Sequence, residues 1–327
     1  MKTLLLGCII SLILTVIGGL ISIPLLKRLK AGQTVLKYVE EHKQKNGTPT
    51  MGGLFFIIPS VLTFFMFGGA SGKVAVFCTA IGLAYMIVGF IDDFIKIKFK
   101  RNEGLKAYQK IVFQLLIAIT AGVFAYVNGI AELFLPFSRK SINLGVLIVP
   151  FVTLIFIAIT NSVNLTDGLD GLASGTSIVY VVFLAIIIML QSRLSELKRF
   201  EEAEYQAIYL IMFTLVGGLL GFLTFNTNKA KVFMGDTGSM SLGGFIGSLS
   251  IFTFNSLFIP VLGITFVLSS ISVIMQVLHY KRTKKRIFLM TPLHHHFQLK
   301  GYTEAQISYC YSLVTLFFGV LLVLVYL

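Results

Sequence analysis

The feature that most constrains this chain is a series of apolar stretches, each close to the ~20 residues that a helix needs to cross a membrane. Only 13% of the 327 residues are charged, about half the fraction found in soluble domains. We therefore predict an all-α, polytopic membrane protein with ten transmembrane helices that forms a single domain over residues 1–327. The predicted helices are 4–26, 51–69, 74–91, 111–128, 144–160, 175–190, 207–225, 241–254, 258–278 and 306–327.

Basic residues predict the orientation of these helices, because Lys and Arg concentrate in cytoplasmic loops. The segments after the first, third, fifth, seventh and ninth predicted helices hold 20 of the 27 basic residues. We therefore expect both termini to be extracytoplasmic. The net charge of +13 follows from this pattern and does not indicate nucleic-acid binding, although it would attract membrane lipid headgroups and anionic substrates. The predicted cytoplasmic loops are about 27–50, 92–110, 161–174, 226–240 and 279–305.

All Asp residues of the chain fall in these predicted cytoplasmic segments. They are Asp92, Asp93, Asp167, Asp170 and Asp236. Carboxylates close to an apolar boundary are costly unless they are paired or bound to a metal. This distribution predicts a functional site at the cytoplasmic face.

The first acidic motif is Asp92-Asp93, at the end of the third predicted helix. Lys96 follows these residues by four and three positions, so it can reach either carboxylate on a helical surface. Adjacent side chains point about 100° apart on a helix. We expect one carboxylate to face a cation or the reacting group and the other to be held by Lys96 or by backbone. The alternative is an acidic pair that ends a helix with a local salt bridge.

The loop after the fifth predicted helix carries oxygen-bearing side chains at every third position. They are Asn161, Asn164, Asp167 and Asp170. Such hard ligands suit Mg²⁺ or the polar groups of a nucleotide. Gly168 and Gly171 would allow close backbone approach. Helix caps and turns are the alternative for one or two of these side chains.

Two further segments combine glycines with polar residues. In the first, Thr48 and Pro49 predict an ordinary helix start, with Thr48 as N-cap, and nearby lysines could add an anion site. In the second, Phe233 precedes Gly235 and Asp236, which predicts a third metal or nucleotide contact. The alternative is that Asp236 caps the next helix.

The last predicted cytoplasmic loop contains three consecutive histidines, His294, His295 and His296, after Pro292. Three adjacent side chains cannot all face one point on a helix. We favour one or two of them donating hydrogen bonds to phosphate or nucleotide, with a soft-metal site and a structural role as alternatives. No Walker A motif is present, which argues against ATP-driven pumping. Carboxylates, lysines and histidines at a membrane surface suit Mg²⁺-assisted phosphoryl transfer.

Five sequence segments together resemble one family, the bacterial phospho-N-acetylmuramoyl-pentapeptide-transferases of the polyprenyl-phosphate N-acetylhexosamine-1-phosphate transferase superfamily. They are residues 47–53, Asp92-Asp93 with Lys96, residues 161–171, residues 233–236 and residues 292–297. The resemblance implies transfer of phospho-MurNAc-pentapeptide from UDP-MurNAc-pentapeptide to undecaprenyl phosphate, giving lipid I and UMP for peptidoglycan. It also implies Mg²⁺ and a multi-pass protein of the bacterial cell membrane.

The resemblance implies residue roles as well. Asp236 is the expected metal ligand, with Asp92, Asp93 and Asp167 as further candidates. The expected catalytic residues are Asp92, Asp93, Asp167, Lys96 and His294. The expected substrate-binding residues are Lys45, Thr50, Lys110, Gln114, Asn161, Asn164, Leu165, Gly168, Asp170, Phe233, His295 and His296. We favour direct attack by the lipid phosphate over a covalent Asp intermediate.

Two other functions compete with this interpretation. A sister enzyme would transfer N-acetylglucosamine 1-phosphate from its UDP carrier to a polyprenyl phosphate through the same acidic motifs. A flippase or transporter of lipid precursors would couple intramembrane acids to ions, but here the acids gather at one predicted surface. The sequence leaves open whether the chain forms a homodimer.

Overall fold

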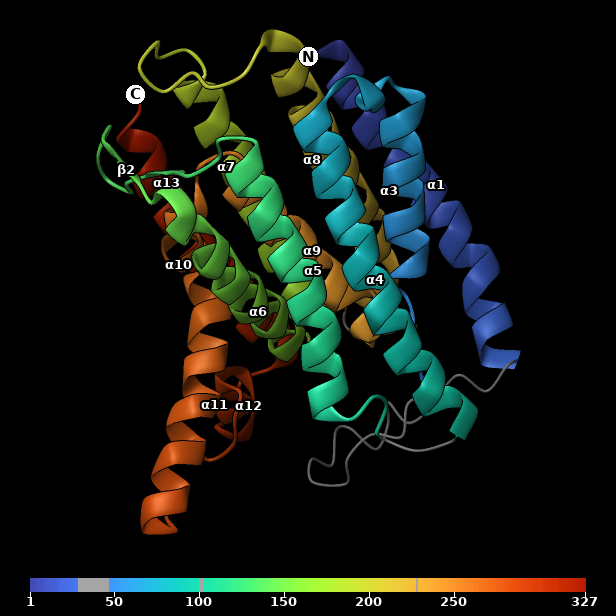
Figure 1. Cartoon of the computed structure of the whole chain (residues 1–327). Helices are drawn as coiled ribbons and strands as arrows, with labels where there is room; N and C mark the ends of the chain where they lie inside the picture. Colours follow the sequence, from blue (N-terminus) through green and yellow to red (C-terminus); the bar gives the residue numbers. More distant parts are fainter. Residues whose placement is uncertain (29–46, 100–102, 228) are drawn as a thin grey trace.

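A computed structural model of the chain describes residues 1–28, 47–99, 103–227 and 229–327 and is built almost wholly of helices (Figure 1). This confirms the all-α prediction. The helices are α1 Lys2–Arg28, α3 Leu54–Met66, α4 Lys73–Phe99, α5 Ala107–Val127, α6 Ile148–Thr166, α7 Leu172–Gln191, α8 Glu202–Asn226, α9 Gly235–Phe252, α10 Ile259–Leu262, α11 Ile264–Thr283, α12 Leu293–Leu299 and α13 Glu304–Leu324. Three 3-10 turns lie at Gly69–Ser71, Gly145–Leu147 and Ser256–Phe258.

Within the described residues, eight helices are long and apolar enough to cross a membrane. They are α1, α4, α5, α6, α7, α8, α11 and α13. The two remaining predicted spans, 51–69 and 241–254, correspond to α3, which has 13 residues, and to α9, which has 18. The structure thus supports a multi-pass membrane protein, while the count of ten crossings stays a prediction.

Helix α9 forms the centre of the bundle, where it packs mainly against α4 and α6. Every residue from Thr237 to Phe252 is buried. Glycines make this packing possible: a Cβ at Gly82 would lie 2.4 Å from the Phe245 ring, and one at Gly243 would lie 2.6 Å from the Thr160 Cα. Small residues let membrane helices approach closely. The glycines and serines of α9 therefore reflect contact with protein on all sides.

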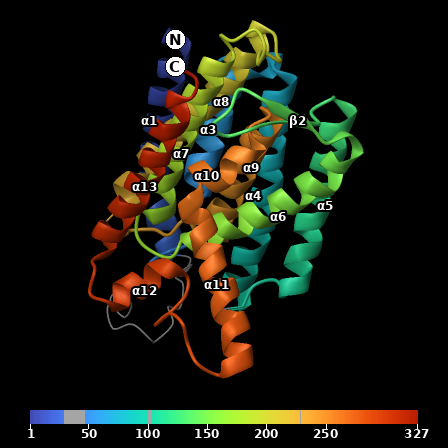
Figure 2. The ribbon, with the colours of Figure 1, turned by 90° about the vertical axis from the view of Figure 1, so that its left-hand side faces the viewer.

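Both chain termini lie at one end of the bundle, whereas α12 lies toward the opposite end (Figures 1 and 2). We call these the terminal end and the α12 end. A short antiparallel hairpin of β1 Glu132–Phe134 and β2 Ser141–Asn143 lies near the terminal end (Figure 2). Arg199 donates to Glu132 at 2.7 Å beside it. The sequence analysis did not predict this hairpin.

Two helices continue past the apolar stretches that predicted them. Helix α4 runs to Phe99, so Asp92, Asp93 and Lys96 lie within it. Helix α6 runs to Thr166, so Asn161 and Asn164 occupy its last turns instead of a loop. Polar side chains can extend a membrane helix in this way when other elements supply partners for them.

The predicted helix start at Thr48 and Pro49 is wrong. Helix α3 begins at Leu54, because the backbone before it pairs with the segment before α9 and then turns at Gly52 and Gly53. The Phe233 amide donates to the Pro49 carbonyl at 2.8 Å, and the Gly52 amide donates to the Phe233 carbonyl at 2.9 Å. This pairing holds residues 49–53 beside the segment that leads to Asp236.

Candidate active site

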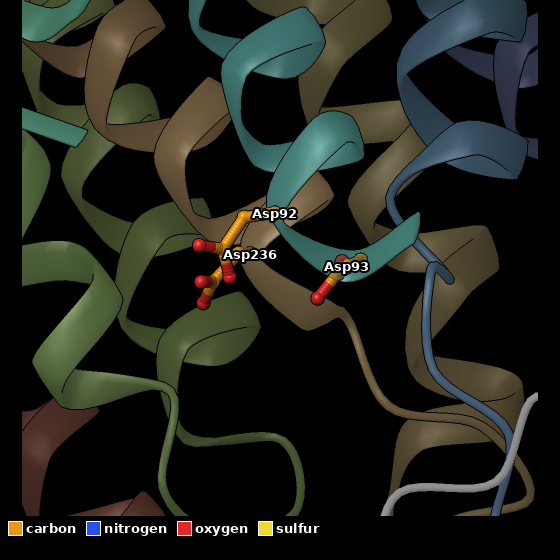
Figure 3. Close-up of side chains that lie close together, drawn as sticks. All are labelled: Asp92, Asp93 and Asp236. Carbon is orange, nitrogen blue, oxygen red and sulfur yellow. The ribbon is translucent and has the colours of Figure 1, made fainter. Parts of the chain in front are cut away.

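Three carboxylates from two helices lie close together in the bundle. Asp92 and Asp93 come from α4 and Asp236 from the first turn of α9 (Figure 3). One oxygen from each lies within 4.8 Å of the others. Gly89 makes this approach possible, because a Cβ there would lie 2.1 Å from the Asp236 carbonyl oxygen. The contact between α4 and α9 thus brings Asp93 and Asp236 together, although they are 143 residues apart in the sequence.

Two lysines neutralise much of this negative charge. Lys96 Nζ lies 2.6 Å from Asp92 Oδ2, 3.0 Å from Asp236 Oδ2 and 3.7 Å from Asp93 Oδ1. Lys110 Nζ lies 2.9 Å from Asp236 Oδ2. The local salt bridge considered above does form, but it is one contact of a cluster that joins α4, α5 and α9. The prediction that Lys96 reaches both carboxylates of the Asp92-Asp93 pair is confirmed.

The two adjacent carboxylates have different partners, as their spacing predicts. Asp92 Oδ1 accepts from the Leu105 amide at 2.9 Å. Asp93 Oδ2 accepts from the Thr237 amide at 2.9 Å and from its hydroxyl at 2.7 Å. Asp93 therefore caps the start of α9 from a neighbouring helix. Among the described residues, Asp236 accepts from Lys96, Lys110 and Asn164 and caps no amide of α9, so the alternative role considered for it is wrong.

Asp236 is held ionised by its surroundings. Burial alone would raise its pKa, but the Lys110 ammonium, a hydrogen bond with Asp92 and the Lys96 ammonium outweigh burial and hold the pKa below its ordinary value. Asn164 Nδ2 also donates to Asp236 Oδ1 at 2.7 Å and to Ser239 Oγ at 2.8 Å. An ionised carboxylate with fixed orientation is suited to bind a cation.

Amide side chains support this cluster from α5 and α6. Asn161 Nδ2 donates to Gln114 Oε1 at 2.9 Å and to the Ile157 carbonyl at 2.8 Å. Gln114 lies one turn beyond Lys110 on α5 and is completely buried. The structure therefore pairs Gln114 and Asn161, two predicted substrate-binding residues, on the same helices that carry Lys110 and Asn164.

Asp167 lies just after α6, at the start of loop 167–171. Burial raises the pKa of its carboxyl well above the ordinary value, and the negative charges of Asp236, Asp93 and Asp170 raise it further. Asp167 thus binds a proton more readily than an exposed carboxyl does. A perturbed carboxyl beside a charged cluster is a candidate acid or base.

Two histidines of α12 pack against loop 167–171. His294 is completely buried, and its Nε2 would lie 2.3 Å from a Cβ at Gly168. Neither ring nitrogen of His294 has a hydrogen-bond partner in the described part of the chain. His295 Nε2 would lie 3.1 Å from the same Cβ. His296 turns elsewhere, since its Nδ1 accepts from the Leu289 amide at 3.1 Å. The structure brings two of the three histidines to the loop.

The buried state of His294 predicts a dependence of stability on pH. Burial, and then the nearby His295, lower the pKa of His294 well below 6.5. Between that lowered pKa and 6.5 the unfolded chain binds a proton that the folded protein does not, so stability falls as pH falls through this range. We expect the Tm of His294→Asn to depend less steeply on pH below 6.5 than that of the wild type. Parallel curves for the two proteins would contradict the prediction.

The other predicted site residues occupy varied positions. Thr50 has a buried hydroxyl with no hydrogen-bond partner among the described residues, and it lies with Asp93 against Gly235. Phe233 belongs to the backbone pairing beside Asp236, Leu165 lies in the last turn of α6, and Lys45 is outside the described residues. The sequence analysis did not assign Thr237 and Ser239 to the site and considered them only as helpers of a helix cap, although hydroxyls next to Asp236 in the sequence were a signal for them.

The donor set fits a divalent cation. Asp92, Asp93 and Asp236 offer carboxylate oxygens, which are the hard ligands that Mg²⁺ prefers. The unpartnered Thr50 hydroxyl and the Lys96 ammonium lie beside them. A cation here would share the three carboxylates with Lys96.

Membrane-length helices around a buried cluster of carboxylates and lysines define a membrane enzyme suited to phosphate chemistry. Comparison with known proteins identifies the class. Residues 74–254 match the family described as "Glycosyl transferase family 4", and residues 45–57 match "Phospho-N-acetylmuramoyl-pentapeptide-transferase signature 1". The chain is thus a transferase.

Relatives that carry the name phospho-N-acetylmuramoyl-pentapeptide-transferase cover nearly the whole chain. One from Caldanaerobacter subterraneus is 41% identical over 94% of both chains. Another from Acetivibrio thermocellus is 40% identical over 96% of this chain and 92% of its own, and one from Desulfitobacterium hafniense is 40% identical over 98% and 97%. This chain belongs to the phospho-N-acetylmuramoyl-pentapeptide-transferase family, whose members are enzymes of peptidoglycan synthesis.

Proposed function

We propose that this chain transfers phospho-MurNAc-pentapeptide from UDP-MurNAc-pentapeptide to undecaprenyl phosphate, with formation of lipid I and release of UMP. An oxygen of the lipid phosphate forms a bond to the sugar-linked phosphorus of the UDP sugar, and the bond from that phosphorus to the oxygen of UMP breaks. The observation that carries the proposal is the cluster of Asp92, Asp93 and Asp236 with Lys96 and Lys110.

Within this reaction, charge neutralisation is the main task of the cluster, because phosphoryl transfer depends on positioning and electrostatic stabilisation. Mg²⁺ held by Asp236 and Asp92 would neutralise phosphate charge. Lys110 and Lys96 add two ammonium groups within 3.0 Å of Asp236 Oδ2, where they can stabilise the developing negative charge.

Apart from metal binding, the acids divide between the two substrates. Asp92 and Asp93 serve the lipid phosphate, one of them as the base for any proton that it carries. Asp167 and Asp170 serve the UDP sugar, together with His294 and His295 of α12, which pack against the loop that carries these two acids. Direct attack needs no covalent intermediate, so trapping of a phosphosugar on an Asp would argue for a two-step reaction.

The active site faces the cytoplasm, where UDP sugars are present. Two observations support this placement. Both termini lie at the end of the bundle opposite α12 (Figure 1), and the basic segment Lys281–Arg286 joins α11 to α12. Positive charge beside spanning helices is typical of the cytoplasmic side.

The decisive experiment measures UMP release by purified, detergent-solubilised protein. The protein is given undecaprenyl phosphate, Mg²⁺ and either UDP-MurNAc-pentapeptide or UDP-N-acetylglucosamine. We expect turnover only with the muramoyl substrate, and none when Mg²⁺ is removed by chelator or when lipid is omitted. Turnover restricted to the acetylglucosamine substrate would identify the sister enzyme. Folded protein that turns over neither substrate would sink the proposal and favour transport.

A further inference from the structure

Glu304, the first residue of α13, contacts a distant loop, and the catalytic arrangement described above gives this contact no role. Its Oε2 accepts from the backbone amide of Asp170 at 2.9 Å. Asp170 lies in loop 167–171, which carries Asp167 and Gly168 and receives the histidines of α12. The contact thus joins the start of α13 to a loop that is 134 residues earlier in the chain.

The bonded loop is in turn tied to the segment before α9. Asp170 Oδ2 accepts from the Ala230 amide at 2.9 Å. The Gly171 amide donates to Asn226 Oδ1 at 3.1 Å, and Asn226 Nδ2 donates to the Val232 carbonyl at 3.0 Å. This second segment leads through Phe233 directly to Asp236. Hydrogen bonds therefore link Glu304, through loop 167–171, to the segment of chain that leads to Asp236.

An acid in the first turn of a helix usually needs no further explanation, because it stabilises the helix N-terminus. Here the hydrogen bonds of the helix start are already supplied by another residue. Thr303 caps α13: its hydroxyl accepts from the Gln306 amide at 3.3 Å, and the Gln306 side chain accepts from the Thr303 amide at 2.9 Å. The carboxylate of Glu304 is directed instead to a neighbouring loop.

The position of Glu304 also links two parts of the site. Helix α12, with His294 and His295, precedes α13 by only a short turn. His294 contacts loop 167–171 at Gly168, and Glu304 contacts it two residues later, at Asp170. The loop is thereby held at two points by one stretch of chain, so its orientation depends on both.

We propose that Glu304 is a positioning residue for the UDP sugar: its carboxylate fixes loop 167–171 against α12 and the segment before α9. This inference rests on the proposed assignment of the loop to the nucleotide side. A hydrogen bond from a backbone amide to a charged acceptor stabilises more than a neutral one, so its loss should be measurable.

The test compares Glu304→Ala, which removes the acceptor, with Glu304→Gln, which keeps an acceptor oxygen at the same distance. Truncation should not prevent folding, since Glu304 already lines a cavity of about 310 Å³ between α7, α8 and α13. Glu202→Ala is the matched control. Glu202 is likewise the first residue of its helix, α8, but its carboxylate accepts from Gln206 of that helix.

Two readouts separate positioning from general stability. In Glu304→Ala we expect faster amide hydrogen exchange in residues 167–171 and 229–232, and a KM for UDP-MurNAc-pentapeptide raised about tenfold. The KM for undecaprenyl phosphate should stay unchanged. Glu304→Gln should return both readouts to within about threefold of wild type, because its amide oxygen still accepts. Glu202→Ala should match wild type.

Other outcomes would overturn the inference in distinguishable ways. Unchanged exchange in loop 167–171 would show that Glu304 does not hold it, whatever the activity. Faster exchange with a raised KM for the lipid alone would instead contradict the assignment of the loop to the nucleotide. A fall in the folded fraction with both KM values at wild-type level would show that the contact is only structural.

Discussion

Replacing Asp236 by Asn is expected to lower kcat by about a thousandfold, which corresponds to about 4 kcal/mol of lost transition-state stabilisation. Asp236 is the acid that joins the cluster: one oxygen contacts Lys96 and Lys110 and the other accepts from Asn164. Asn has the same shape but no charge, so it weakens both the metal site and the hold on two ammonium groups. UMP release under saturating substrates measures the effect.

The control for this substitution is Glu132→Gln near the terminal end. Glu132 is also a partly buried acid in an ion pair, with Arg199 at 2.7 Å, but it is far from the site. It should keep kcat within about twofold of wild type, since a partly exposed ion pair contributes little. A folded Asp236→Asn protein that retained a tenth of wild-type kcat would exclude Asp236 as a ligand essential for the reaction.

The architecture was predictable from the apolar stretches, because backbone in lipid must satisfy its own hydrogen bonds and helices do so locally. The helix ends were not. The apolar stretch of α4 stops at residue 91, yet the helix continues to Phe99 because Lys96 and the Leu105 amide supply partners for Asp92, and Thr237 supplies partners for Asp93. Likewise, the sequence around Pro49 predicts a helix start, but in the structure the Pro49 carbonyl accepts from the Phe233 amide.

The grouping of the acids was predictable from the sequence, but their individual contacts were not. Acids confined to one predicted side of a membrane protein must meet at one surface, so the grouping of Asp92, Asp93 and Asp236 follows from topology. Which oxygen contacts which partner depends on tertiary packing. The capping of α9 by Asp93 requires the contact between α4 and α9. Glu304 looks like any acid in a first helical turn until its partner in a distant loop is known.

The contact between α4 and α9 can be tested with Gly89→Ala, which is expected to lower kcat by at least about a hundredfold. The added Cβ would lie 2.1 Å from the Asp236 carbonyl oxygen and 2.7 Å from the Thr237 nitrogen. Both atoms are backbone, so the start of α9 must move. A displacement of about 1 Å at reacting groups costs about a hundredfold in rate.

Two other glycines separate this effect from packing in general. Gly82→Ala also collides with α9, at 2.4 Å from the Phe245 ring, but two turns farther from the acids. It should lower Tm, since overpacking costs about 1–3 kcal/mol, with a smaller loss of kcat. Gly18→Ala meets Phe55 at an ordinary 3.4 Å and should match wild type. If Gly89→Ala lost activity only in proportion to its folded fraction, as expected of Gly82→Ala, then the spacing of α4 and α9 at Asp236 would not control the reaction. A Gly89→Ala protein that keeps its Tm but loses kcat would show that this one missing Cβ sets the distance between the carboxylates.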